Sequence, residues 1–593
     1  MPIDTASQAL LQNAISLHRN GELERAAAIY ARVLQSAPTD ANVLHLYGLV
    51  RHQLGAHAEG AAHIQRAVDL VPDQPVLRNN LGDALRMAGD PHGAIVQLRA
   101  ALALRPDYAG AHLNLCACFS AVKQHDAALQ HGREAVRLAP EQTQAHFNLG
   151  LAQLDAVLLE DAATSFREVL RRDPDHPGAI SNLLYLLNLI PGLDPHAIAA
   201  EHRRIGARWD QAARSAAPAP PPEHTQPLRI GYVSRDLKAH AVVHFFEPVL
   251  AHHDRGRFQV WCYSDTEQPD AVTERLRGLA DHWHAVAGWN DRRLHDQIRQ
   301  DRIDVLVDLG GHTENNRLAV FAHKPASLQL SWIGYPNTTG LSAMDYRIVD
   351  VHSAADDQPG SEALLRLPRV FACYRPHGHA PPVSALPALA TGQLTFGSLH
   401  RLEKLNGVVI ALWSRLLQAL PGARLLIARD ELDAWQQRRI SREFATHGID
   451  AARLLLRQLD GSRSFLEEYA DIDVHLDVHP WSGHTIACSA LWQGVPTITL
   501  EGKSHAGRMV SSVLTAVGLQ DLIAKDAADY QRIAMDLAAD VAALAGLRAS
   551  LRERVANSPL RDEQGFTAAG GGRALEDAIS RALRDSSARN ARS

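Results

Sequence analysis

The segment DVHLDVHPWSGHTIACSALWQG (473–494) has residue types and spacing that could bind an anion. It predicts a strand, then the turn Ser482-Gly483-His484-Thr485, then an apolar helix. The first N–H groups of a helix have no intrahelical acceptor, and a glycine flanked by hydroxyls lets a diphosphate approach them closely. An ordinary N-cap formed by Ser482 or Thr485 would explain the same residues. The pattern alone leaves both interpretations open.

The elements that must hold this turn follow from an alternation of apolar and amphipathic stretches beyond residue 228. The apolar runs are LRIGYVS, FQVWCYS, DVLVDLG and YRIVD and, after the connector 375–392, LTFGSL, ARLLIARD, ARLLLRQL, VHLDV and PTITL. Such βα alternation is typical of parallel sheets. We expect two α/β lobes, 228–390 and 391–593, with the active site in the crevice between them. Neither GxGxxG after the first strand nor GxxxxGK[ST] occurs, which disfavours a dehydrogenase or a P-loop NTPase.

The first part of the chain repeats every 34 residues. The repeat is marked by prolines at Pro38, Pro72, Pro106, Pro140 and Pro174. Small residues precede each proline by 24 positions, at Ala14, Gly48, Gly82, Cys116 and Gly150. This register resembles the tetratricopeptide repeat family and predicts helical hairpins over residues 1–212 that stack into a superhelix. The concave surface of such a superhelix usually binds protein segments.

A column of asparagines falls in the same register. It comprises Asn80, Asn114, Asn148 and Asn182. A side-chain amide both donates and accepts hydrogen bonds, so we expect this column to hold an extended acceptor peptide by its backbone. Alternatively, the amides satisfy backbone groups between neighbouring repeats.

Composition and charge narrow the possible functions. A chain of 593 residues should form more than one folded unit, and a net charge of −6 provides no basic field for nucleic acid. The five cysteines lack CxxC pairs, which argues against a disulfide framework or a zinc site. We expect a cytoplasmic protein that does not bind membranes, because the first residues lack signal-peptide features and no long apolar run occurs. The segment 213–227 (ARSAAPAPPPEHTQP) predicts a stiff linker between the repeats and the lobes.

Five segments resemble, in order and spacing, the catalytic region of protein O-GlcNAc transferases. They are LRIGYVSRDLKAHAVVHFF (228–246), GGHTENNR (310–317), WIGYPNTTGLSAMDYRIVD (332–350), FGSLHRLEKLNGVVIALW (396–413) and SGHTIACSALWQGVPTITLEG (482–502). With the repeats before them, the resemblance extends over nearly the whole chain. It implies a two-lobed GT-B fold and UDP-GlcNAc as co-substrate, with no other cofactor. It also implies inverting, metal-independent transfer to Ser or Thr hydroxyls of protein or peptide acceptors.

The resemblance also assigns roles to individual residues. Lys404 matches a lysine that contacts the donor phosphates, where a cation stabilises the leaving nucleotide. His240 matches a cleft histidine assigned as general base, although a histidine that only positions substrate would also fit. His244, one helical turn later, and His312 are weaker candidates for acceptor binding. The further residues expected to bind the donor are Arg401, Phe465, Ser482, Gly483, His484, Thr485, Ile486 and Ser489.

Two donor positions depart from the animal-type pattern, and other functions therefore stay open. Ser489 replaces an acidic residue on the donor ribose, and Phe465 aligns with a histidine that stacks on uracil. Plant-type protein O-fucosyltransferases share the repeats, the lobes and an FGS segment, here 396–398, but use GDP-fucose. A repeat scaffold that binds a nucleotide sugar without catalysis is a third possibility. The acceptor proteins, a homo-oligomeric state and the identity of the general base are left open.

Overall fold

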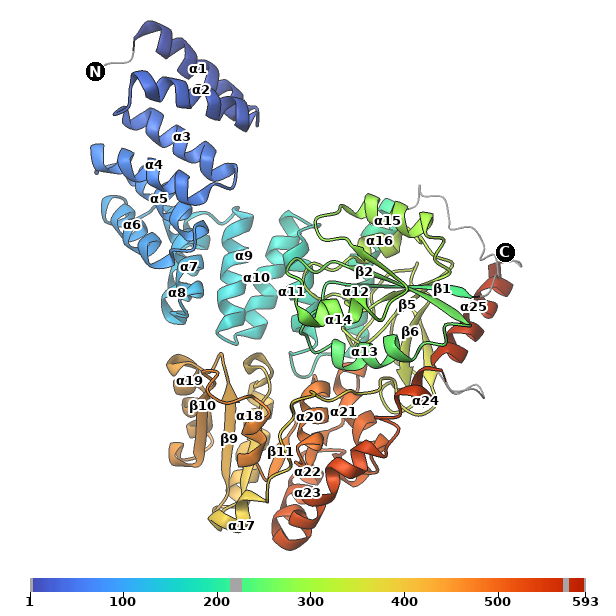
Figure 1. Cartoon of the computed structure of the whole chain (residues 1–593). Helices are drawn as coiled ribbons and strands as arrows, with labels where there is room; N and C mark the ends of the chain where they lie inside the picture. Colours follow the sequence, from blue (N-terminus) through green and yellow to red (C-terminus); the bar gives the residue numbers. More distant parts are fainter. Residues whose placement is uncertain (1–3, 214–226, 569–574, 591–593) are drawn as a thin grey trace. The chain divides into compact units, whose positions relative to one another are not determined.

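The structure is a computed structural model that describes residues 4–213, 227–568 and 575–590 (Figure 1). The chain divides into two compact units, Met1–Ala179 and Ile180–Ser593, here called unit 1 and unit 2. The predicted architecture, helical repeats followed by two parallel α/β lobes, is confirmed. The expected linker lies almost entirely outside the described residues. No helix in the described ranges is long and apolar enough to cross a membrane.

Unit 1 is built from helices that pack in consecutive pairs. They are α1 (Thr5–Arg19), α2 (Leu23–Ser36), α3 (Ala41–Gln53), α4 (His57–Leu70), α5 (Pro75–Met87), α6 (Pro91–Leu104), α7 (Ala109–Ala121), α8 (His125–Leu138), α9 (Thr143–Asp155) and α10 (Leu159–Arg172). The second helix of every pair ends two residues before a repeat proline, because proline cannot continue the helix. A Cβ added at Gly48 would lie 2.6 Å from Ile64 Cγ1, which explains the small residues of the register.

Unit 2 contains two parallel sheets in its described residues. The seven-stranded sheet of the N-terminal lobe has the order β3-β2-β1-β4-β5-β6-β7. Its strands are β1 (Leu228–Ser234), β2 (Phe258–Ser264), β3 (His282–Ala285), β4 (Val305–Asp308), β5 (Leu328–Ser331), β6 (Tyr346–Asp350) and β7 (Ala363–Leu367). The six-stranded sheet of the C-terminal lobe has the order β10-β9-β8-β11-β12-β13. Its strands are β8 (Thr395–Ser398), β9 (Arg424–Arg429), β10 (Leu454–Gln458), β11 (Val474–Leu476), β12 (Thr497–Leu500) and β13 (Ile523–Ala524).

Helices cover both sheets, which explains why the central strands β1, β4, β5 and β8 are buried over consecutive residues rather than at alternate ones. Unit 2 begins within α11 (Pro177–Leu187), and α12 (Pro195–Ala213) follows. The N-terminal lobe carries α13 (Val243–His252), α14 (Ala271–Arg277), α15 (Asp291–Gln300) and α16 (Leu318–Ala322). The later helices are α17 (Pro387–Thr391), α18 (Gly407–Ala419), α19 (Ala434–Thr446), α20 (His484–Trp492), α21 (His505–Ala516), α22 (Ala527–Ala539), α23 (Val541–Ala556), α24 (Glu563–Thr567) and α25 (Leu575–Asn590). Short 3₁₀ turns are η1 (Leu402–Lys404), η2 (Ala451–Arg453), η3 (Glu467–Asp471) and η4 (Gln520–Leu522).

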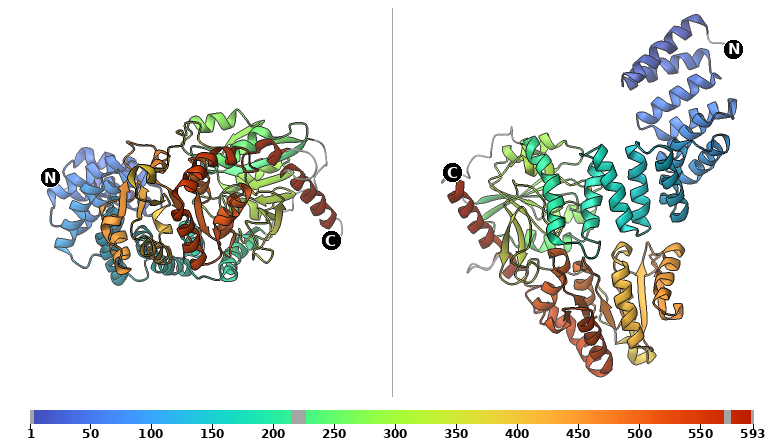
Figure 2. Two further views of the ribbon diagram at one scale, coloured as in Figure 1. Left: turned by 90° about the horizontal axis from the view of Figure 1, so that it is seen from below. Right: turned by 180° about the vertical axis from the view of Figure 1, so that it is seen from behind.

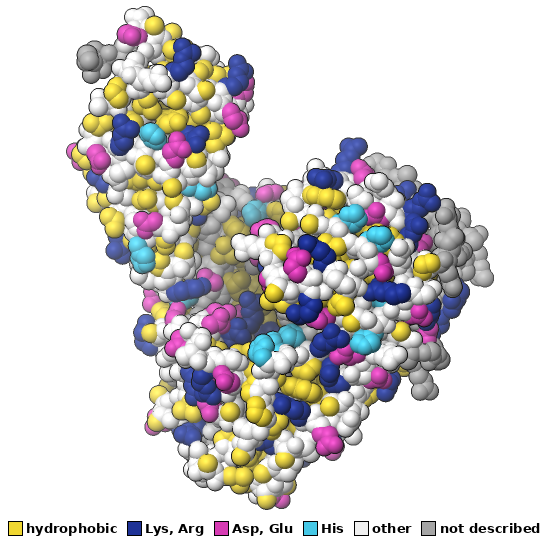
Figure 3. Space-filling view, viewed as in Figure 1, with side chains coloured by type: hydrophobic (Ala, Val, Ile, Leu, Met, Phe, Trp, Pro, Cys, Tyr) yellow, Lys and Arg dark blue, Asp and Glu magenta, His cyan; other side chains and the backbone are white. Residues whose placement is uncertain are grey.

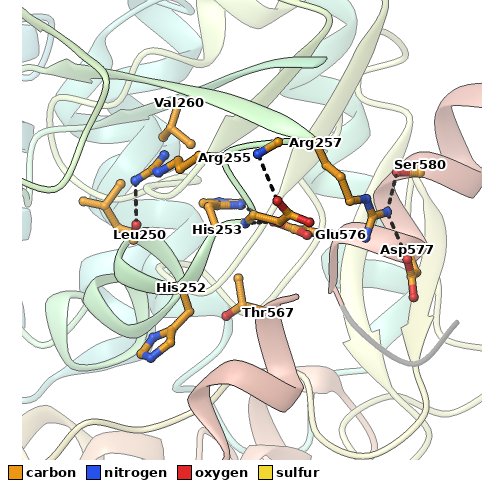
Figure 4. Close-up of polar contacts among 12 residues, drawn as sticks. Leu250, His252, His253, Arg255, Arg257, Val260, Thr567, Glu576, Asp577 and Ser580 are labelled. Carbon is orange, nitrogen blue, oxygen red and sulfur yellow. Dashed lines mark hydrogen bonds and ion pairs between the residues drawn. The ribbon is translucent and has the colours of Figure 1, made fainter. Parts of the chain in front are cut away.

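The last two helices, α24 and α25, pack against the N-terminal lobe. We expected residues 391–593, which include them, to form the C-terminal lobe. Both views of Figure 2 show α25 (red) beside the green N-terminal lobe. Figure 4 shows the polar contacts that hold it there. The buried Glu576 carboxylate accepts hydrogen bonds from His253 Nδ1 at 2.8 Å and from the Asp254 N–H at 2.9 Å. Arg257 Nη2 lies 3.0 Å from the Asp577 carboxylate on the next position of α25.

Candidate active site

The topology of the two sheets brings four chain segments together. The strand order reverses between β1 and β4 in the first sheet and between β8 and β11 in the second. Parallel α/β sheets bind ligands at such switch points, beyond the carboxyl ends of the strands. The segments that leave these four strand ends are 235–240, 309–312, 399–404 and 477–485. They contain most of the residues predicted to carry the chemistry.

The turn before α20 is open to an anion rather than capped by a side chain. Gly483 is the N-cap residue of α20 and makes no side-chain cap to the helix, although its own N–H donates to the Asp477 carboxylate at 2.8 Å. The Ser482 hydroxyl donates instead to the Ala506 carbonyl at 2.8 Å. The first hydrogen bond of the helix ladder runs from the Ala487 N–H to the Gly483 carbonyl. Neither Ser482 nor Thr485 is therefore the N-cap, since Gly483 holds that position and Thr485 lies within the helix. The N–H groups of the first helical turn are suited to bind an external acceptor.

Asp477, at the end of β11, holds this turn in place. Its carboxylate accepts hydrogen bonds from the Gly483 N–H at 2.8 Å and from the Thr499 hydroxyl at 2.7 Å. These bonds and the neighbouring His400 lower the pKa of the Asp477 carboxyl, although its burial opposes the shift. A Cβ at Gly483 would come within 2.0 Å of His400 Nε2. Glycine is therefore needed here because a side chain would clash with His400. The Gly483 N–H is not available to a ligand, because it already donates to Asp477.

Lys404 lies at the end of η1, directly beside this turn. Its Nζ atom lies 3.4 Å from the Ser482 carbonyl oxygen and 4.7 Å from the centroid of the Trp481 ring. Desolvation lowers the pKa of Lys404 to about 8, although the carboxylates of Asp477 and Glu403 oppose the shift. A lysine with this pKa is still mostly protonated at pH 7. The ammonium is thus a partly desolvated charge that a phosphate would stabilise.

Arg401 and α11 meet at the same end of the C-terminal lobe. The Arg401 side chain is 59% exposed and its Nε lies 3.3 Å from Glu403 Oε1. The Tyr185 hydroxyl, on α11, donates to the same carboxylate oxygen at 2.8 Å. The Tyr185 ring also packs 5.1 Å from the Trp481 ring. The helix that opens unit 2 is therefore in contact with the segment that supports Lys404.

His240 follows β1 and is accessible to a substrate. Its side chain is 43% exposed, and its Nδ1 lies 3.8 Å from an oxygen of the buried Asp236. Partial desolvation lowers the pKa of His240, the cations Lys238 and Arg401 add to this, and Asp236 opposes it. A neutral imidazole beside a carboxylate is suited to accept a proton.

His244 and Phe465 lie in a group of aromatic rings between the lobes. His244 Nδ1 donates to the Arg375 carbonyl at 2.9 Å, which leaves its Nε2 as the acceptor. The His377 ring lies 4.0 Å from the His244 ring and 6.1 Å from the Phe465 ring. Figure 3 shows histidine side chains (cyan) next to Lys and Arg side chains (dark blue) on the face that it draws. The rings offer planar surfaces on which a nucleobase could stack.

The other predicted donor residues differ in accessibility. Thr485 and Ile486 are partly exposed on the first turn of α20, and the Ile486 carbonyl accepts from Tyr469 at 3.0 Å. His484 is buried and stacks 4.4 Å from the Phe245 ring of the N-terminal lobe. Ser489 is fully buried, with its Oγ 3.3 Å from the Tyr374 hydroxyl. Ser489 contributes no exposed surface, so a direct contact with a ribose is not available in this conformation.

His312 lies inside the N-terminal lobe rather than at its surface. It is completely buried, and its Nε2 is 2.7 Å from the Thr339 carbonyl oxygen. Burial lowers its pKa to about 3. Its ring packs 5.2 Å from His202, whose Nε2 is 2.7 Å from the Tyr335 hydroxyl. A side chain enclosed in this way is not exposed to an acceptor, so acceptor binding by His312 stays a prediction that its burial disfavours.

The asparagine column makes contacts from one repeat to the next. Each amide nitrogen contacts a residue 35 positions earlier: Asn80 contacts His45 Nε2 at 2.9 Å, Asn114 contacts Asn79 Oδ1 at 3.2 Å, and Asn148 contacts the Leu113 carbonyl at 3.4 Å. Asn182 lies on α11, in unit 2. These contacts fit the alternative in which the asparagine amides join neighbouring repeats. Peptide binding by the column stays a prediction.

Sequence reasoning missed three residues that support the site: Asp477, Trp481 and Asp236. Asp477 and Asp236 follow β11 and β1 closely, and this position at a strand end was a usable signal. Nothing in the local sequence of Trp481 indicated that its ring would meet Lys404. Within the described part of the chain, no group of three or more His, Cys, Asp or Glu side chains is arranged to hold a metal ion.

Comparison with known families matches both parts of the chain. The model described as glycosyl transferase family 41 matches residues 197–372 and 385–569. Tetratricopeptide repeat models match residues 11–75, 79–143 and 121–177.

Individual proteins and solved structures that resemble this chain include N-acetylglucosaminyltransferases. The chain is 38% identical over 426 residues to the probable UDP-N-acetylglucosamine–peptide N-acetylglucosaminyltransferase SPINDLY of Oryza sativa subsp. japonica, covering 68% of this chain and 44% of that protein. It is 28% identical over 350 residues to the similarly named protein SEC of Arabidopsis thaliana, covering 56% and 35%. This chain thus spans less than half the length of these relatives. A mutant O-GlcNAc transferase from Thermobaculum terrenum superposes with a TM-score of 0.76 and 34% identity, covering 87% of this chain and 98% of the other.

Proposed function

Since this chain belongs to glycosyl transferase family 41, we propose that it transfers N-acetylglucosamine from UDP-GlcNAc to Ser or Thr hydroxyls of proteins. The observation that carries the proposal is the position of Lys404 beside the open N-terminus of α20. A cation and a set of free N–H groups suit a diphosphate leaving group. The structural similarity to an O-GlcNAc transferase over nearly all of that protein supports the same donor.

The proposed reaction is a displacement at the anomeric carbon. The acceptor oxygen forms a bond to this carbon while the bond to the phosphate oxygen breaks, so the configuration inverts. The acceptor proton passes to His240, whose lowered pKa keeps it neutral and able to accept it. The electron pair leaves with UDP, whose added negative charge is stabilised by Lys404 and the N-terminus of α20.

The tetratricopeptide repeats support a protein partner as acceptor. We propose that the acceptor binds along the repeat helices, with the asparagine column as one contact. A cytoplasmic location and independence of metal are further expectations, whereas the oligomeric state is open. Dialysis against EDTA followed by a transfer assay tests the independence of metal, and activity restored only by a divalent ion would contradict it.

The proposal is tested by a donor screen with a peptide library as acceptor. We expect UDP release and a mass increase of one N-acetylhexosamine with UDP-GlcNAc, and loss of about 100-fold or more in kcat for Lys404→Met. Arg532→Met, an exposed change on α22, is the matched control and should keep full activity. Equal turnover in Lys404→Met and the unchanged protein would favour a scaffold that does not catalyse transfer.

Protein O-fucosylation is the second candidate. The FGS segment 396–398 forms the end of β8, and the buried Ser489 supplies no acidic group for a ribose. Turnover with GDP-fucose and none with UDP-GlcNAc would replace the first proposal by this one, with the same roles for Lys404 and His240.

A further inference from the structure

The ring of His484 packs against two phenylalanines of the N-terminal lobe, although His484 itself opens α20 of the C-terminal lobe. The Phe245 ring, on α13, stacks on it with the ring centroids 4.4 Å apart and the planes 19° apart. The Phe371 ring, which follows β7, lies 4.9 Å away at an angle of 30°. His484 is 7% exposed and Phe245 is 2% exposed, so solvent is largely excluded from this contact. Aromatic rings at such distances stabilise one another beyond the apolar area that they bury.

The His484 ring behaves as an uncharged plane in this contact. Burial lowers the pKa of His484 to about 3, so the imidazole is neutral at physiological pH. Its Nε2 has no hydrogen-bond partner within the described part of the chain. The donor seat described above uses the backbone N–H groups of the first turn of α20. The ring of His484 is therefore engaged by the N-terminal lobe, while the backbone of the same turn belongs to the donor seat.

A second contact joins α13 to α20. The Tyr374 ring lies 5.6 Å from the Phe245 ring, and the Tyr374 hydroxyl lies 3.3 Å from Ser489 Oγ on α20. Both Tyr374 and Ser489 are buried. Phe245 thus contacts the first residue of α20 directly, and it reaches Ser489 through Tyr374. The two contacts restrain α20 relative to α13.

The backbone that leads into α13 carries both Phe245 and the proposed base, His240. The His240 carbonyl accepts a hydrogen bond from the Val243 N–H at 3.1 Å. The Val242 carbonyl accepts one from the Phe245 N–H at 3.0 Å. These overlapping turns fix the position of His240 relative to Phe245. The stack on His484 therefore connects the backbone of the proposed base with the backbone of the donor seat.

We propose that Phe245 is a positioning residue for the transfer reaction: by stacking on His484, it sets the position of His240 relative to the donor seat at the start of α20. The inference rests on the proposed function, because it concerns the same reaction. Misplacement of a reacting group by about 1 Å can cost about 100-fold in rate. Loss of the Phe245 ring should therefore lower kcat. Nucleotide binding should persist, because Lys404 and α20 both belong to the C-terminal lobe.

The test compares Phe245→Leu with Phe246→Leu in the full chain. Phe246 is the matched control, because it is also buried on α13 but packs 4.9 Å from Tyr232 within the N-terminal lobe. We expect Phe245→Leu to lower kcat about 10-fold or more. Its Kd for UDP, measured by calorimetry, should change by less than about 3-fold. Phe246→Leu should lower Tm at least as much as Phe245→Leu and keep kcat within about 2-fold. Equal losses of kcat in both variants would overturn the proposal.

Further variants test the stack from its other side. His484→Phe keeps an uncharged ring and should keep kcat and UDP affinity within about 3-fold, whereas His484→Ala should lose kcat as Phe245→Leu does. This pair carries the test alone if Phe245→Leu does not fold. In a His240→Asn background, Phe245→Leu should cause little further loss, because residues that act as a unit are not additive. Loss of UDP binding in His484→Phe, or additive losses with His240→Asn, would overturn the proposal.

Failure of the proposed function is read separately, from the unchanged chain. No transfer from UDP-GlcNAc by that chain would contradict the proposed donor. If GDP-fucose is the working donor, the same variants are compared with GDP in place of UDP. The role of Phe245 is refuted when the unchanged chain transfers sugar and Phe245→Leu transfers it equally fast. Absence of transfer from every donor would remove both proposals.

Discussion

The ammonium of Lys404 lies 4.7 Å from the centre of the Trp481 ring, within the range of a cation–π interaction. Trp481 is in turn in contact with Tyr185 on α11, at a ring distance of 5.1 Å. The tryptophan therefore fixes the cation that we propose to act on the leaving group.

We predict that Trp481→Leu lowers kcat by about 2- to 30-fold, because a cation–π contact contributes about 0.5–2 kcal/mol. Trp481→Phe, which keeps a ring, should lose less. Trp492→Leu is the matched control, since that ring faces Arg552 rather than Lys404. Steady-state transfer kinetics measure the effect, and equal losses in the Trp481 and Trp492 variants would argue against a positioning role.

Gly483→Ala should weaken binding of UDP by about 100-fold, since its Cβ would come within 2.0 Å of His400 Nε2 and displace the turn. Truncation of the clashing ring in the double variant Gly483→Ala, His400→Ala should restore part of the affinity. Gly407→Ala is the control, because a Cβ there meets no atom within 4 Å. Calorimetric titration with UDP measures the affinity of the single variant, the double variant and the control. No recovery in the double variant would show that the clash is not the cause.

The pH dependence of kcat/KM should be bell-shaped. Lys404 acts as a cation, and because its pKa is lowered to about 8, activity should fall as the pH rises through that value. His240 acts as a neutral base, and because its pKa is lowered from 6.5, its acid limb should lie below pH 6.5. In Lys404→Arg the alkaline limb should move upward, since arginine stays charged. An alkaline limb that is unmoved in this variant would remove Lys404 as its origin.

Glu576→Ala should lower the free energy of unfolding by about 3–5 kcal/mol, because it leaves a buried polar network without its carboxylate. His253, which donates to Glu576, also has its Nε2 2.8 Å from the Tyr232 hydroxyl, so three buried groups are affected. Asp577→Asn, at a partly exposed ion pair, should cost only about 0.2–1 kcal/mol. Denaturant unfolding monitored by circular dichroism compares the two, and similar small losses would mean that Glu576 does not anchor α25.

Some of the site was predictable because its signals are local. The turn 482–485 combines a glycine, hydroxyls and a following apolar helix within a few residues, and it lies at the N-terminus of α20 as expected. Other features were not predictable. Ser482 reads as a cap, yet its hydroxyl bonds to Ala506, a residue that only the packing of α21 brings near. The sequence motif around His312 suggested a residue that contacts the acceptor. In the structure His312 is enclosed by α12 and the loop after β5.

The repeat register and the βα alternation were determined by the sequence itself. Both follow from the spacing of prolines, small residues and apolar residues along the chain, which does not depend on contacts between distant segments. The tertiary structure decided which side chains meet. Lys404 and Trp481 are far apart in the chain, and they become neighbours because β8 and β11 pair side by side. Ser512 and Asp350 come from different lobes, so their 2.6 Å hydrogen bond depends on how the lobes pack. Side-chain proximity of this kind follows from the pairing of strands and the packing of helices, which no local pattern of residues encodes.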